Sequence, residues 1–191
     1  MDRQTEIDLL QEITALKDSG SFFLDATQTA NKAEAYCSEA RFLAERDAIF
    51  RRVPVMAAHA SELDGPDSFM RRQVAGLPLL LTRDGTGQAH AFLNVCRHRG
   101  TRLVDDAAGC ARRFTCPYHA WTWDNRGELA AIPHRVEGFP DLDRASFGLK
   151  RLGCVERHGR IVVAAAGPAR QAIDGHLAVR VPGFDWAVAA G

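Results

Sequence analysis

Two short stretches of the sequence, CRHRG and CPYHAW, constrain the fold of this chain more than any other feature. Each places one cysteine and one histidine at very short range, Cys96 with His98 and Cys116 with His119. Both stretches follow segments that we expect to be strands, so the two pairs are expected on loops held by a rigid sheet. Such loops often carry metal ligands, and the fold has to bring these two together.

The composition is that of an ordinary globular protein, with 191 residues, 46% of them hydrophobic, and no formal net charge. No run of like charges and no long apolar stretch is present, so neither nucleic acid nor a membrane is indicated as a partner. The N-terminus lacks the apolar core of a signal peptide. The five cysteines are not spaced like a disulfide framework. We therefore expect a cytoplasmic protein, in which clustered Cys and His indicate metal or redox chemistry.

The sequence divides into a helical part and a β part. Apolar residues recur at helical spacing in residues 3–18 and 31–50, which predicts a helical N-terminal arm. Beyond Pro54, short apolar segments alternate with Gly, Asp and Asn turns, a pattern typical of antiparallel β structure. The expected strands lie at 77–83, 89–95, 112–116, 121–124, 128–132, 149–156 and 160–166.

Three interpretations of the two Cys-His pairs compete. The first is that the four residues are unrelated, and two pairs at similarly short spacing argue against it. A Cys₂His₂ zinc site usually takes both cysteines from one element and both histidines from the other, whereas here each loop supplies one of each. In a Rieske [2Fe–2S] centre two cysteines hold one iron and two histidines hold the other. The pattern favours the Rieske centre, with a zinc-stabilised interaction module as the alternative.

The ligand set would also determine the redox behaviour of such a centre. Two thiolates and two neutral imidazoles leave the oxidised centre neutral, whereas four thiolates would leave a dianion. An electron is added more easily to a neutral centre, so Rieske potentials lie at roughly −150 to +300 mV, against about −400 mV for plant-type ferredoxins. Each imidazole keeps a second nitrogen that can titrate or donate to a partner. We therefore expect the electron to leave through the histidine-held iron.

Residues of about 41–166 resemble the Rieske domain of Rieske non-haem iron oxygenase α subunits, the ring-hydroxylating and related mono- and dioxygenases. The resemblance rests on FLAERDAIFRRVPVMAAHASEL, LNVCRHRG and FTCPYHAWTWDNRGEL, and covers about two thirds of the chain. It implies a mainly antiparallel β sandwich of the Rieske type, with a cluster-binding subdomain and an N-terminal α-helical arm. It also implies a [2Fe–2S] cluster with Cys96 and Cys116 on the inner iron and His98 and His119 on the outer iron.

Three positions in the loops indicate which branch of Rieske proteins the chain resembles. Respiratory-chain Rieske proteins carry disulfide-forming cysteines where this sequence has Thr101 and Tyr118, and a serine where it has Trp121. Both features raise the potential, so we expect a low-potential centre of the oxygenase type. Tyr118 and Trp121 are expected to form walls around the cluster.

The chain departs from the family after the Rieske region. The α subunits continue into a catalytic domain with a mononuclear iron held by two histidines and a carboxylate. Asp174 and His176 lie close together in this sequence but lack the family's spacing. We expect a helical arm over 1–50, a Rieske domain over 51–167, and a tail over 168–191 that begins an absent catalytic domain.

The resemblance implies one-electron transfer as the module through which electrons enter an oxygenase. A reductase or ferredoxin would be the donor, and an oxygenase catalytic domain or chain the acceptor. Mononuclear Fe(II) is expected only with that domain or chain. The resemblance favours an oxidoreductase of the oxygenase α-subunit kind, with the mononuclear-iron domain not in this chain. The chain is expected to be a truncated α subunit, a natural stand-alone protein, or a ferredoxin-type electron carrier. The helical arm favours an α-subunit origin. An α-subunit origin is also compatible with assembly into a homo-oligomer.

Overall fold

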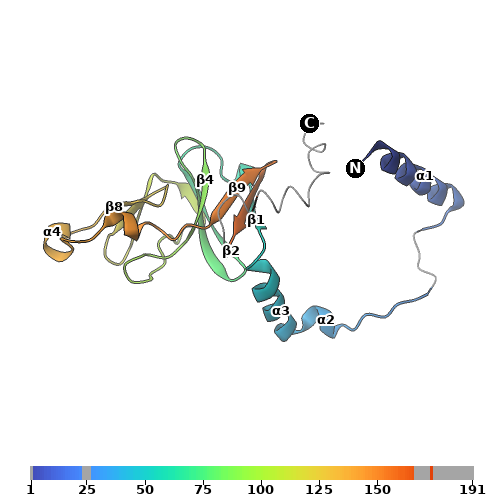
Figure 1. Ribbon diagram of the computed structural model, residues 1–191, viewed down its shortest axis with the longest axis horizontal. Coiled ribbons are helices and arrows are strands. Elements are labelled where there is room, and N and C mark those ends of the chain that lie inside the picture. The colour runs from blue at the N-terminus through green and yellow to red at the C-terminus, as the bar shows by residue number, and fades with distance from the viewer. Residues whose placement is uncertain (1, 23–26, 166–172, 174–191) are drawn as a thin grey trace.

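Three antiparallel sheets make up the β part of the protein in the computed structural model (Figure 1). The structure describes residues 2–22, 27–165 and 173. The sheets have the strand orders β1-β10-β9, β4-β3-β2-β5 and β6-β7-β8. The strands are β1 (Val55–His59), β2 (Ser68–Val74), β3 (Leu77–Arg83), β4 (Ala89–Leu93), β5 (Ala108–Cys110), β6 (Arg113–Thr115), β7 (Thr122–Asp124), β8 (Leu129–Ala131), β9 (Gly153–Arg157) and β10 (Arg160–Ala164).

The mainly antiparallel β fold expected from the sequence is confirmed. The three predicted hairpins form, β3 with β4, β7 with β8, and β9 with β10. Strands β1, β2 and β5 were not predicted. In β2 the run Arg71–Arg72 breaks the apolar pattern, and the three residues of β5 are all exposed. Pairing with neighbouring strands, rather than a local pattern of side chains, therefore forms these strands.

The second sheet lies between the other two and buries both of its faces. Successive side chains of a strand point to opposite faces. On β3, Leu79 and Leu81 accordingly pack with Ile161 and Val163 of the first sheet. Leu80, between them, packs in a second core cluster with aromatic residues of the third sheet. This second cluster also contains Cys96 and Cys116, so the predicted metal ligands are anchored in the core.

The turn between β7 and β8 fastens the third sheet to the second. Thr82 Oγ1 donates to the carbonyl of Asn125 at 2.6 Å, and Asn125 Nδ2 donates to Asp67 Oδ1 at 2.7 Å. Gly127 in this turn has φ +80°, and a Cβ built on it would lie 2.3 Å from the Phe92 ring. Only glycine fits so close an approach in this backbone conformation.

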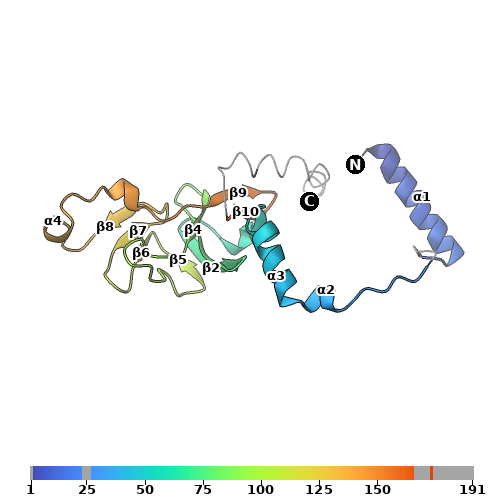
Figure 2. The same ribbon diagram turned by 60° about the horizontal axis from the view of Figure 1, so that its bottom comes forward.

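The N-terminal arm is helical, as predicted, but it is broken at Ser38. The side chain of Ser38, in an extended backbone conformation, accepts a hydrogen bond from Arg41 N and so starts a new helix. The arm consists of α1 (Arg3–Ser19), α2 (Glu34–Cys37), α3 (Glu39–Glu45) and the π-helical turn η1 (Arg46–Phe50). Helix α1 buries no side chain and lies away from the sheets in both views (Figure 2). Within the described ranges, no helix is long and apolar enough to cross a membrane.

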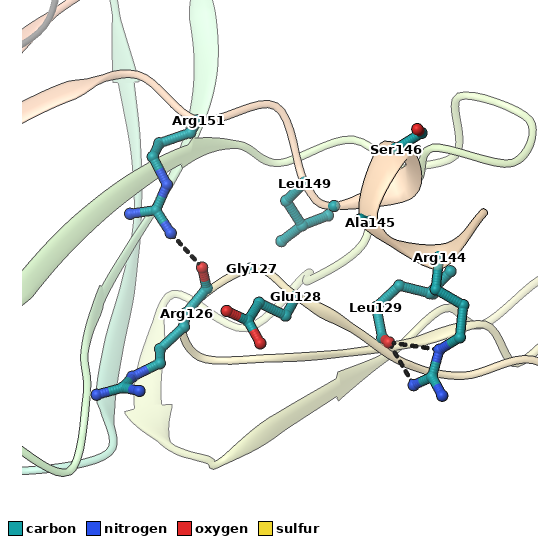
Figure 3. A pocket seen from close by; sticks show the side chains of 10 residues that line it. Arg126, Gly127, Glu128, Leu129, Arg144, Ala145, Ser146, Leu149 and Arg151 are labelled. Atoms are coloured by element: carbon teal, nitrogen blue, oxygen red, sulfur yellow. Dashed lines mark hydrogen bonds between the residues drawn. The ribbon is translucent and has the colours of Figure 1, made fainter.

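An excursion between β8 and β9, residues 132–152, extends the third sheet at one end of the molecule (Figure 2). It contains the short helices α4 (Arg135–Gly138) and η3 (Arg144–Phe147); a further 3₁₀ turn, η2 (Ala60–Glu62), follows β1. An open pocket of about 620 Å³ is lined by η3 and by the β7–β8 turn (Figure 3). Arg144 ties η3 to β8 by donating to the carbonyl of Leu129 at 2.6 Å.

The predicted tail over 168–191 lies outside the described residues, apart from the buried Ile173.

Candidate metal centre

The first Cys-His pair lies on a tight loop that follows β4. The Cys96 amide donates to the carbonyl of Thr101 at 2.7 Å, and the Cys96 carbonyl accepts from the Gly100 amide at 3.0 Å. The fully buried Asn94 braces this loop, because its side chain donates to the Val104 carbonyl and accepts from the Val104 amide, at 2.7 and 2.9 Å. These hydrogen bonds fix the backbone of the loop at both ends.

The second pair, on the loop between β6 and β7, repeats this geometry. The Cys116 amide donates to the Trp121 carbonyl at 2.8 Å, and the Cys116 carbonyl accepts from the Ala120 amide at 3.0 Å. The fourth position after each cysteine has a left-handed backbone, with φ 75° at Gly100 and 55° at Ala120. The two loops therefore use the same turn to present one thiol and one imidazole each.

The two thiols lie on the inner side of the site and the two imidazoles on the outer side. Cys96 and Cys116 are 3% and 2% exposed, whereas both histidines are half-buried. The imidazole centroids are 4.8 Å apart, and the rings are inclined at 68°. The structure thus brings the two predicted histidines together and the two predicted cysteines together, with the cysteines more deeply buried than the histidines.

The electrostatics of the site suit metal ligation. Burial raises the pKa of the Cys96 thiol; the backbone amides of His98 and Arg99 oppose this, and the neighbouring Cys116 adds to it. Burial also lowers the pKa of His98, with further contributions from His119 and Arg99. Imidazole ligates a metal in its neutral form, and a cation beside two close thiols would favour their thiolates.

One buried atom tests whether the residues fit a metal cluster. Nδ1 of His98 is buried and has no hydrogen-bond partner within the described part of the chain. Such a nitrogen costs about 1–3 kcal/mol when it is left unsatisfied. A bond to a metal would satisfy it, so the donor set and its burial fit the [2Fe–2S] centre that the sequence predicts.

No three His, Cys, Asp or Glu side chains among the described residues are grouped so that they could hold one metal ion. A Rieske centre needs only two protein ligands at each of its two irons. Asp174 and His176, which we considered for a second iron site, lie outside the described residues.

Aromatic rings enclose the His98 side of the site. Trp121 stacks on the His98 imidazole, with centroids 4.7 Å apart and planes within 2°, and Phe139 approaches His98 edge-on at 5.9 Å. Tyr118, which is 58% exposed, lies over His119 at 3.8 Å. Tyr118 and Trp121 thus lie where walls were expected. The sequence did not predict Phe139, because it comes from the excursion, which carries no strand or motif signal.

Comparisons with known proteins agree with this geometry. A family model described as the Rieske [2Fe–2S] domain matches residues 53–151. The chain is 34% identical over 136 residues to the anthranilate 1,2-dioxygenase large subunit of Acinetobacter baylyi, covering 71% of this chain and 29% of that protein. It is 34% identical over 131 residues to the glycine betaine monooxygenase oxygenase subunit of Pseudomonas aeruginosa, covering 69% and 30%.

Solved structures of oxygenases are similar as well. Naphthalene 1,2-dioxygenase with bound indole superimposes with a TM-score of 0.65 at 30% identity, over 72% of this chain and 32% of that one. A quaternary ammonium Rieske monooxygenase in complex with L-carnitine gives 0.68 at 31% identity, over 79% and 41%. The chain therefore spans about a third of the length of the proteins that it matches.

Proposed function

This chain belongs to the Rieske [2Fe–2S] domain family, and we propose that it transfers single electrons through a cluster held by its two Cys-His pairs. In this proposal the Cys96 and Cys116 thiolates bind the inner iron, and the His98 and His119 imidazoles bind the outer iron. When bound, the cluster supplies the one-electron chemistry. The observation that carries the assignment is the buried Nδ1 of His98, which has no hydrogen-bond partner among the described residues and belongs to a ring 4.8 Å from the second imidazole.

The protein's own residues prepare the site for this role. The paired loops hold the four donors in place through backbone hydrogen bonds, which reduces the cost of ordering them when metal binds. Burial keeps water from the thiol side, while the half-buried histidines leave the other side open to a partner. Thr101, Tyr118 and Trp121 replace the residues that raise the potential in respiratory-chain Rieske proteins. We therefore propose a low-potential, oxygenase-type centre.

We propose that the chain works within a Rieske oxygenase system. Its relatives are subunits of oxygenases. The chain spans 29% and 30% of the length of the two relatives described above. A reductase or ferredoxin would donate the electron, and a catalytic domain or chain with a mononuclear iron would accept it. The helical arm, which compact ferredoxins lack, supports an α-subunit origin. We propose the boundaries 1–50, 51–167 and 168–191 for arm, Rieske domain and tail, and a cytoplasmic location, which the lack of a disulfide framework supports.

Substitution of the ligands tests the assignment. We expect His98→Ala and Cys116→Ser to lose the visible absorbance of the cluster and much of the stability, because the cluster ties the two loops together. Cys110→Ser is the matched control, since Cys110 is an exposed cysteine outside the site; it should keep the full spectrum. A ligand variant that retained the full spectrum would show that the assignment is wrong. A colourless wild-type protein containing zinc would favour the alternative, a zinc-stabilised interaction module.

A further inference from the structure

The two histidines of the site have different surroundings. The His98 ring is stacked on Trp121, which is only 2% exposed, and it meets the Phe139 ring at an interplanar angle of 89°. His119 is covered on its outer side by the exposed Tyr118. The environment of His98 therefore depends on aromatic packing that His119 lacks.

Phe139 supplies the part of this packing that comes from far along the chain. Its ring also meets Trp121 at 5.2 Å and 90°, so it contacts both members of the stacked pair. Residues 133–141 are all exposed except Phe139, which is half-buried. Phe139 packs against the core cluster that contains Cys96 and Cys116, as does Leu142 just beyond this stretch. Phe139 thus fastens the outer end of the excursion to the site.

The inner end of the excursion is fastened independently. Arg144 donates to the carbonyl of Leu129 (Figure 3) and to that of Ala130. Trp123 Nε1 donates to the Phe147 carbonyl at 2.8 Å. These bonds do not involve Phe139. A change at Phe139 should therefore loosen the cover over His98 and leave η3 in place.

We propose that Phe139 is a positioning residue for electron transfer: with Trp121 it shields the buried part of the His98 imidazole from water and thereby holds the reduction potential low. This inference rests on the proposed function. The oxidised centre with two thiolates and two neutral imidazoles is neutral, and the added electron makes it an anion. Water stabilises the anion more than the neutral form, and solvent exposure is one determinant of such potentials. Removing the Phe139 ring should therefore raise the potential.

The test is a redox titration of the full-length protein with its cluster, followed by circular dichroism or EPR. Phe139→Ala should shift the equilibrium with a one-electron mediator about tenfold toward the reduced form, which corresponds to about 59 mV. Phe139→Leu, which restores an apolar cover, should stay close to the wild type. Val136→Ala is the matched control from the helix α4, which ends just before Phe139, because Val136 is 79% exposed; it should leave the potential unchanged. An unchanged or lowered potential in Phe139→Ala overturns the proposal.

A second variant and a second measurement keep the proposal testable if the alanine variant does not fold. Phe139→Val retains part of the apolar side chain and should raise the potential by a smaller amount. In deuterated buffer, pulsed EPR of the reduced Phe139→Val cluster should show stronger deuterium modulation than the wild type; equal modulation counts against water exclusion. A wild-type protein without a cluster would overturn the proposed function. A wild-type cluster whose potential is insensitive to residue 139 would overturn only this inference.

Discussion

We expect Asp84→Asn to destabilise the protein markedly, because the carboxylate of Asp84 links the second sheet to the β7–β8 turn. Asp84 is 1% exposed. Its Oδ1 accepts hydrogen bonds from the Thr86 amide and hydroxyl, at 2.9 and 2.6 Å, and from the Gln88 amide at 3.1 Å. Its Oδ2 accepts from His90 Nε2 and from Arg126 Nε, both at 3.0 Å. Removing the charge therefore affects a fully bonded, buried group.

The size of the effect follows from which bonds asparagine can keep. The asparagine oxygen can replace Oδ1, but its NH₂ group would face the N–H donors of His90 and Arg126. His90 Nδ1 lies 3.0 Å from Arg151 Nη1, a donor, so Nε2 carries the imidazole proton. A hydrogen bond to a charged group contributes about 1.5–3 kcal/mol. Arg126 is half exposed and can recover part of its loss from water. We therefore expect a loss of about 3 kcal/mol in the free energy of unfolding.

The effect should depend on pH in a defined direction. Burial alone raises the pKa of Asp84, but hydrogen bonds from Thr86, His90 and Gln88 outweigh it and hold the pKa well below its usual value. The unfolded chain has the ordinary pKa of about 3.9, so at acid pH the unfolded state binds more protons than the folded state. The stabilisation by Asp84 is complete above about pH 5 and is lost as the pH falls below about 4.

Urea unfolding followed by far-UV circular dichroism measures the effect at about pH 7 and about pH 3. Asp105→Asn is the matched control, because Asp105 forms an ion pair with Arg102 that is largely exposed on both sides; it should cost less than about 0.5 kcal/mol. The reasoning is refuted if Asp84→Asn costs less than about 1 kcal/mol at neutral pH, or if its cost is the same at both pH values.

Two further predictions concern backbone positions. Gly127→Ala should cost at least about 2 kcal/mol, because the new Cβ would overlap the Phe92 ring and φ is +80°; Gly85→Ala, where nothing lies within 4 Å, should cost less than about 1 kcal/mol. Equal urea midpoints for the two variants would contradict this. Ala120→Gly should stabilise the apoprotein by about 0.5–1 kcal/mol, because φ 55° strains alanine; a lower thermal midpoint than the wild type would argue against it.

The candidate site could be proposed from the sequence because its information is local. Each Cys-His pair lies within four residues, and each follows a strand whose hydrophobic segment is evident in the sequence, 89–95 before Cys96 and 112–116 at Cys116. The short turns flanked by Gly and Asp likewise indicated the hairpins. The structure adds that both loops use one backbone turn. This was hidden at the second loop because Ala120, rather than glycine, occupies the left-handed position.

The features that the sequence did not predict depend on distant contacts. Phe139 reaches back from the excursion to contact Trp121 and His98. No regular spacing in the sequence connects these positions. Strand β5 exists because it pairs with β2, and its own residues are exposed. At Ser38 one side-chain cap interrupts a helical pattern. The capped break and a continuous helix differ by only a small free energy, so the pattern alone does not distinguish them.

The central claim is a Rieske [2Fe–2S] centre on the two Cys-His loops, and its most direct test is the metal and sulfide content of anaerobically purified protein. We expect two irons and two acid-labile sulfides per chain, with a rhombic EPR signal of low average g after reduction by dithionite. One zinc per chain with no sulfide would contradict the account and leave the oxygenase family as ancestry alone.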